Sequence, residues 1–254
     1  MIRRLTQIAA LSLACITSLH ATVYTIDPRH TQGTFSWEHL GFSNPSAQFT
    51  LVRGSLHFDP ADPTKASVVV TIPLDEINTG VPELNAYLRD DAFFDLAKYS
   101  TATFTSTKVE KGMAPDKLKV TGNLDLHGHI KPVVLDVTIN KVGVDPRDKN
   151  LPMVGFDATT TLKRSDFGLG LYVGLVSDEI RIHITCQGIE AQAYAAHQRS
   201  GADEAAKDAT QKAKIAKDAK LDADEAAQDA IQKSQMAKDA EEKAAAAAAM
   251  PRSQ

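Results

Sequence analysis

The alternation of apolar and polar side chains between Lys117 and Val134 constrains the fold of this chain most strongly. Every second position carries an apolar residue, at Leu118, Val120, Leu124 and Leu126. A period of two is typical of a β-strand with one buried and one solvated face. Gly122 interrupts the apolar row and Gly128 ends it, and glycine within a strand indicates a bulge, a bend or a close approach. The segment therefore predicts a strand of an antiparallel sheet.

The same alternation recurs between Thr22 and about Gln192, interrupted by turn residues. It covers residues 23–26, 33–39, 49–58, 68–72, 133–139, 154–160 and 180–186. About eight to ten strands with short connections predict an all-β sandwich or barrel. The parity of the apolar positions changes at Arg53-Gly54, which predicts a bulge at that point.

One segment, residues 82–99, has helical rather than alternating spacing. Its apolar residues are Leu84, Leu88, Phe93 and Phe94. Pro82 suits the first turn of a helix, where its missing N–H is not needed. A helix here would cap one end of a barrel or make a plain contact with the sheet.

The first 21 residues have the pattern of a secretory leader. Arg3 and Arg4 precede an apolar run from Leu5 to Leu19, and small Ala21 suits a cleavage site. The run is shorter than the ~20 apolar residues that span a bilayer. Lipid attachment at Cys15 is the less favoured alternative, because the residues before it lack a large apolar side chain at the required place. We expect an exported, periplasmic protein.

Charge and cysteine content limit the partners of the exported chain. Without Arg3 and Arg4 it has 26 basic and 32 acidic side chains, which argues against a nucleic-acid partner. Only Cys186 remains, so no internal disulfide forms. Because Cys186 continues the alternation of Ile180, Ile182 and Ile184, a small buried side chain is favoured over a reactive thiol.

Residues 193–254 have the composition of a helical tail. From Ala202 to Ala249 there is no Gly or Pro, and alanine recurs at every seventh position from Ala202 to Ala244. The segment beginning at Asp203 is nearly repeated at Asp224, three heptads later. An alanine seam over residues 202–249 is compatible with a weak homo-oligomeric coiled coil and equally with a solvated single helix.

Residues 22–191 resemble the YceI-like family of secreted polyisoprenoid-binding proteins. The motifs that carry the resemblance are YTIDPRHT from Tyr24, FSWEHLGF from Phe35, INTG from Ile77, YLRDDAFFD from Tyr87, TFTST from Thr103, VTGNLDLHGHIKPVVLDV from Val120, RSDFG from Arg164 and the strand around Ile180–Ile184. Ala47-Gln48 and His129 depart from the family pattern, and the tail lies outside it. The resemblance implies an extended eight-stranded antiparallel, lipocalin-like barrel at residues 22–192 with an elongated apolar cavity. It also implies a carrier or store for a long-chain lipid such as an isoprenoid quinone, with no cofactor.

A lipid site needs an apolar cavity with few polar groups near its mouth. The candidate lining residues are Phe35, Trp37, Phe49, Phe104, Leu124, Leu126 and Phe156 of the strands, with Leu88, Phe93 and Phe94 of the helix. Gly33 and Gly122 would leave room beside them. Arg164 and Asp166, on one strand face, and His39 are candidates for a ligand head group. Structural roles are favoured for all three, and for His39 this is the role of a buried, hydrogen-bonded histidine.

Two other classes of function stay open. His127 and His129 on one strand face suggest a metal-dependent enzyme, but a zinc site needs further ligands that the sequence does not indicate. A structural envelope protein that acts through its helical tail is the second alternative. For the lipid-binding class, transient contact with a membrane or a membrane protein is a further expectation.

Overall fold

The computed structural model describes residues 21–248, and the expected leader lies outside the described residues except for Ala21. The chain divides into two units, of which the first ends at Ala195 and the second begins at Ala196. Ten strands are present in the described part: β1 (Thr22–Ile26), β2 (Gln32–Ser36), β3 (Ser46–Phe49), β4 (Arg53–Phe58), β5 (Ser67–Pro73), β6 (Thr101–Lys111), β7 (Lys117–Leu126), β8 (His129–Val144), β9 (Pro152–Lys163) and β10 (Glu179–Glu190).

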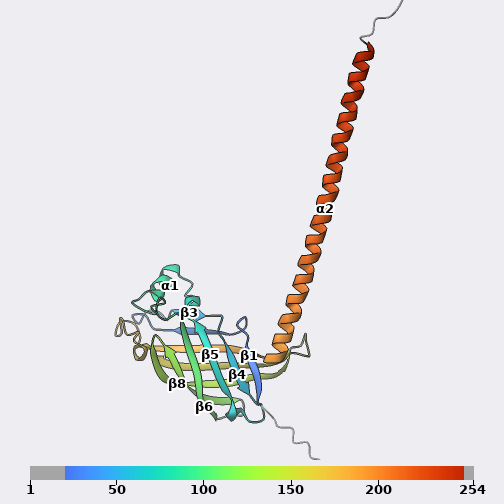
Figure 1. Ribbon diagram of the computed structural model, residues 1–254. Coiled ribbons are helices and arrows are strands. Elements are labelled where there is room, and N and C mark those ends of the chain that lie inside the picture. The colour runs from blue at the N-terminus through green and yellow to red at the C-terminus, as the bar shows by residue number, and fades with distance from the viewer. Residues whose placement is uncertain (1–20, 249–254) are drawn as a thin grey trace, which may run out of the picture. The chain divides into compact units, whose positions relative to one another are not determined.

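The ten strands form one closed antiparallel barrel with eight strand positions (Figure 1). β1 and β2 follow each other along the same side of β10, pairing with residues 188–190 and 181–185. β3 pairs with β2, and β4 pairs with β1, so these two also share one position. The sheet then continues in sequence order from β4 to β10. This confirms the eight-stranded antiparallel barrel.

The alternation in β7 places one row of side chains inside the barrel. Leu118, Val120 and Leu124 are buried, whereas Lys119 and Asn123 are exposed. Val120 lies opposite Val109 of β6 and Leu135 of β8, so the apolar rows of three strands meet on the inner face.

The predicted bulge at Arg53-Gly54 is wrong. β3 ends at Phe49 and β4 begins at Arg53, and the two strands have different neighbours. Leu51 between them has a positive φ of 54°, which turns the chain out of one strand and into the next. The apolar parity changes because two strands meet here, not because one strand contains an extra residue.

The predicted helix at residues 82–99 is present but shorter, as α1 (Pro82–Arg89). The carboxylate of Asp90 accepts a hydrogen bond from the N–H of Asp91, 2.8 Å away, and such local bonds compete with helix continuation. Phe93 and Phe94 belong to the irregular segment that follows, where Asp95 has a positive φ of 46°. They still pack against the apolar core together with Leu88, so this end of the barrel is covered (Figure 1).

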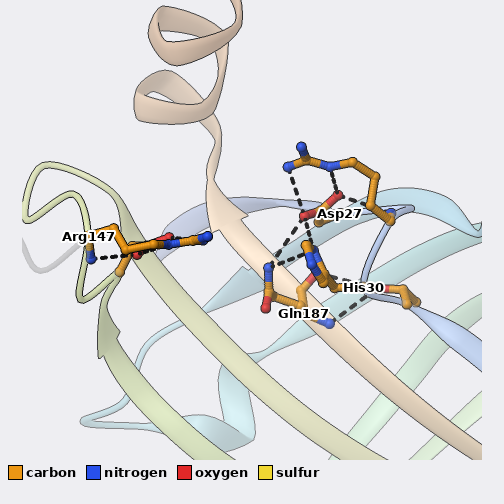
Figure 2. Close-up of polar contacts among 7 residues, drawn as sticks. Asp27, His30, Arg147 and Gln187 are labelled. Atoms are coloured by element: carbon orange, nitrogen blue, oxygen red, sulfur yellow. Dashed lines mark hydrogen bonds and ion pairs between the residues drawn. The ribbon is translucent and has the colours of Figure 1, made fainter.

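A buried carboxylate holds the break between β1 and β2 (Figure 2). Asp27 is 0% exposed and accepts hydrogen bonds from the side chains of Arg29 (3.0 and 3.2 Å) and Gln187 (3.3 Å), and it pairs with His30 Nδ1 at 2.8 Å. Burial alone raises the pKa of Asp27, but the hydrogen bonds from Arg29 and His30 outweigh it and hold that pKa below its ordinary value. Asp145 and Arg147 repeat the same Asp-Pro-Arg geometry on the turn between β8 and β9.

We expect Asp27→Asn to cost about 2 kcal/mol of unfolding free energy at pH 7, because the amide cannot satisfy the donors that face the carboxylate. The lowered pKa means that the carboxylate stabilises the fold above the unfolded pKa of about 3.9, and that this contribution is lost as the pH falls through the folded value. Denaturant unfolding at pH 7 and pH 3 should therefore show that the difference in unfolding free energy between wild type and variant is smaller at pH 3. Glu38→Gln, at an exposed carboxylate, is the control. A gap of equal size at both pH values would contradict the assignment.

The second unit contains most of helix α2 (Ala191–Ala248). Glu190 caps its start, since the carboxylate accepts hydrogen bonds from the N–H groups of Gln192 (3.1 Å) and Ala193 (2.7 Å). From Ala195 onward, every side chain whose burial is described is exposed. This confirms a helical tail. Among the residues that the structure describes, no helix is both long and apolar enough to cross a bilayer.

Candidate functional site

The barrel encloses a cavity of about 470 Å³. Its wall is formed by the inner rows of the strands, which include Val70 of β5, Leu118 and Val120 of β7, and Ile182 of β10. Phe58 and Phe156, both lining residues, pack edge to face with ring centroids 5.3 Å apart. Because the side chains do not fill the interior, the barrel has space for an apolar ligand.

Twelve of the thirteen residues expected at the site line this cavity. They are Phe35, Trp37, His39, Phe49, Leu88, Phe93, Phe94, Phe104, Leu124, Leu126, Phe156 and Arg164. The structure thus brings together aromatic and aliphatic side chains from strands distant in the sequence and from the α1 region. Direct contact with a ligand stays a prediction for each of them.

Asp166 is the residue that the structure does not bring to the cavity. The RSDFG segment is not a strand but a turn of 3₁₀-helix, Arg164–Phe167, so alternation does not apply to it. In this turn Arg164 and Phe167 are buried, whereas Asp166 is exposed and is not a lining residue. The expectation that Arg164 and Asp166 share a face is therefore wrong.

His39 lies at the surface end of the cavity, and the expectation of a buried histidine is wrong. It is exposed while it also lines the cavity. β2 ends at Ser36, and His39 forms isolated bridges to Ser43 and Val176 instead of continuing the strand. Tyr87, Leu171 and Tyr172 are likewise exposed lining residues. These four side chains mark where the cavity reaches the surface between α1 and the loops.

Arg164 fixes the loop that follows it. The side chain is 7% exposed, and its Nε donates to the carbonyl of Ser177 at 2.9 Å. Nη1 donates to the carbonyls of Leu169 and Leu171, and Nη2 donates to that of Val176 at 3.2 Å. Burial lowers the pKa of Arg164, while the charge of Asp178 opposes this shift. The guanidinium therefore holds the backbone of residues 169–177 around one buried point.

Gly33 and Gly122 do not leave empty space in the way the sequence suggested. The ring of Phe49 lies over Gly33, its cross-strand partner, and a Cβ at Gly33 would overlap that ring. The ring of Phe104 lies over Gly122 in the same manner, and a Cβ there would also stand 2.7 Å from the carbonyl oxygen of Thr105. The two glycines let these rings lie close to the barrel wall.

We expect Gly33→Ala to destabilise the protein by about 1–3 kcal/mol, because the methyl group displaces the ring of Phe49. The three atoms nearest to an added Cβ at Gly33 belong to that side chain, so the double variant Gly33→Ala/Phe49→Ala should lose less stability than the sum of the two single variants. Denaturant unfolding of the four proteins measures this coupling. Additive losses would show that the ring is not what opposes the methyl group.

The sequence analysis did not assign the loop and β10 residues that complete the site to the cavity wall. Ile180, Ile182, Ile184 and Cys186 of β10 line the cavity, and their alternation was a signal that could have assigned them. Burial raises the pKa of the Cys186 thiol to about 11, which keeps it protonated. Leu171, Tyr172 and Val176 lie in an irregular loop without any periodic signal.

The two histidines considered for a metal site, His127 and His129, do not lie on one strand face as expected, because His127 lies in a turn. His127 and Gly128 form the two-residue turn between β7 and β8, where both have positive φ values, of 53° and 74°. His127 Nδ1 lies 3.1 Å from the carbonyl oxygen of Phe167, and its ring packs against that of Tyr99. Over residues 21–248, no three His, Cys, Asp or Glu side chains come together as a metal site requires.

Comparison with known proteins agrees with this architecture. The sequence pattern of the YceI-like domain matches residues 24–188. A UPF0312 protein of Vibrio cholerae is 34% identical over 182 residues, which are 69% of this chain and 94% of the relative. Protein YceI of Salmonella arizonae is 35% identical over 172 residues, covering 67% of this chain and 88% of the relative.

A solved structure has the same fold. The crystal structure of the YceI protein of Campylobacter jejuni superposes with a TM-score of 0.54 at 31% identity, covering 60% of this chain and 89% of that one. The family match covers residues 24–188, which include nearly all of the barrel. The chain therefore belongs to the YceI-like domain family.

Proposed function

We propose that the barrel holds one long-chain amphipathic lipid, of the polyisoprenoid or fatty type, for transport or storage in the periplasm. The observation that carries the proposal is the apolar cavity of about 470 Å³, which reaches the surface beside Tyr87 and Tyr172. Its volume falls within the range of roughly 300–1,000 Å³ that is typical of small-molecule sites.

Partition of an apolar chain from water into the cavity supplies the affinity. Burial contributes about 25 cal/mol per Å² of apolar surface, so no specific head-group contact is required for useful binding. The side chains that carry a polar group at the surface end, His39, Tyr87 and Tyr172, suit the polar end of such a ligand. An isoprenoid quinone has this combination of a long apolar tail and a compact polar head.

The test is to purify the protein from its native host and to extract it with organic solvent for mass spectrometry. We expect one long-chain lipid per chain, together with saturable binding of an environment-sensitive fluorescent fatty acid by the extracted protein. Repeated recovery without lipid, combined with no binding of the fluorescent probe, would refute the proposal.

For the tail we propose self-association through the alanine positions of residues 202–249. The support is that α2 is one continuous helix over these positions as far as Ala248. A chain that ends at Arg199 should keep its lipid and become monomeric in analytical ultracentrifugation. If the full chain is already monomeric, the tail is a solvated single helix.

A further inference from the structure

Exposed apolar side chains gather where the cavity reaches the surface. They lie on the loop after β2, on α1 and on the loop before β10, and we call them the rim: Leu40, Phe42, Tyr87, Leu171, Tyr172 and Leu175. Phe42 is 92% exposed, Leu175 63% and Tyr172 50%. Tyr87, Leu171 and Tyr172 also line the cavity, so the rim is continuous with the apolar interior. Large exposed apolar patches are typical of protein or membrane contact sites.

The rim is built as one surface. The N–H of Leu40 donates to the carbonyl of Leu175 at 3.1 Å, and His39 bridges to Val176. Tyr87 on α1 and Tyr172 on the loop before β10 are neighbours, and both side chains line the cavity. Beneath that loop, the guanidinium of Arg164 binds its carbonyls. The three segments therefore present their apolar side chains together.

The backbone of both loops is in a conformation that bulky residues rarely adopt. Leu40 has a φ of 55° and Tyr172 a φ of 61°, each within two residues of a glycine that also has positive φ. Left-handed backbone is uncommon for such side chains, and it persists where the surrounding structure enforces it. The loops thus keep Leu40 and Tyr172 at the surface at a conformational cost.

We propose that the rim docks on the surface of a lipid bilayer, so that the apolar chain passes between membrane and cavity without crossing water. This inference rests on the proposed function. The two rim loops suit a bilayer because residues 40–52 and 167–177 contain no charged side chain, and the charged residues near the rim, such as Glu83 and Arg89, lie on α1. A protein-binding surface usually surrounds its apolar centre with a polar border. Tyrosine rings are typical of the membrane interface, where one end of the side chain stays hydrated.

The test is co-flotation with net-neutral vesicles of the zwitterionic lipids phosphatidylcholine and phosphatidylethanolamine, using the chain from Thr22 to Gln254. We expect Phe42→Ser/Leu175→Ser to lower the vesicle partition coefficient by about 100-fold, because two exposed apolar side chains no longer enter the interface. The matched control is Met113→Ser. Met113 is fully exposed on the turn between β6 and β7, which follows the end of β6 that is distant from Thr101. Its replacement should change the vesicle partition coefficient less than about twofold.

The lipid content of the same preparations separates this inference from the proposed function. Solvent extraction should recover the same lipid from the rim variant as from the wild-type protein, since Phe42 and Leu175 do not line the cavity. A rim variant that floats as well as the wild type, or a wild-type protein that does not float with protein-free vesicles, would overturn the docking proposal. Protein without lipid would instead overturn the proposed function, whereas flotation reports on the rim alone.

Discussion

Replacing Ala102 and Ala158 by phenylalanine should abolish lipid binding while the barrel stays folded. Both alanines are buried and line the cavity, Ala102 from β6 and Ala158 from β9. In a well-packed core, added side-chain volume costs about 1–3 kcal/mol. Here the new rings can enter the cavity, so the cost in stability should be at the lower end. The space that the ligand needs is then taken by the protein itself.

The measurement is titration with a fluorescent fatty acid, followed by lipid extraction from the purified variant. We expect affinity to fall at least about tenfold for each ring, since each displaces apolar contact area that the ligand would bury. The matched control is Thr105→Phe/Thr159→Phe, on the same two strands at exposed outer positions. Unchanged binding by the cavity-filling variant would place the ligand outside the barrel.

Arg164→Met should lower the free energy of unfolding by about 3 kcal/mol, because buried carbonyls lose a charged donor. For a domain of this size that corresponds to a decrease in Tm of roughly 6–12 °C. Carbonyls of Leu171, Val176 and Ser177 all bind this one side chain, so the loop before β10 should loosen. Chymotrypsin should then cleave near Tyr172 faster than in the wild-type protein.

Two further variants identify the cause of that loss. Arg164→Lys should recover only part of the stability, because the ammonium group cannot reproduce the planar arrangement of donors of a guanidinium. Arg181→Met removes an arginine from an exposed position of β10 and should leave Tm within about 2 °C. If Arg164→Lys is as stable as the wild-type protein, the charge alone and not the geometry holds the loop.

The barrel could be predicted because alternation and turn residues are local signals. Leu118, Val120 and Leu124 needed only a period of two to be placed inside. The end of α1 at Arg89 was harder to predict from the sequence, because Phe93 and Phe94 keep helical spacing although they lie beyond the helix. Asp166 was misplaced because a 3₁₀ turn of four residues has no periodic pattern of its own.

The surface end of the cavity could not be predicted because it depends on contacts between distant segments. Leu40 is hydrogen-bonded to Leu175, and His39 forms a β-bridge with Val176, although more than 130 residues separate the partners in the sequence. Neither loop has a repeating pattern, and the conformation of the loop before β10 depends on the buried Arg164. The space under Phe49 and Phe104 was also misjudged, because a glycine in a strand indicates a close approach without naming the group that approaches.

The position of β10 has a consequence for how the protein matures. It is the last strand of the barrel to be synthesised, yet β1 and β2, the first, both pair with it. The barrel cannot close until residues 179–190 have emerged, and such distant pairings are slow to form. The apolar inner rows stay open to water until then, so the incomplete chain is prone to aggregate. A chain truncated before Glu179 should aggregate instead of folding in part.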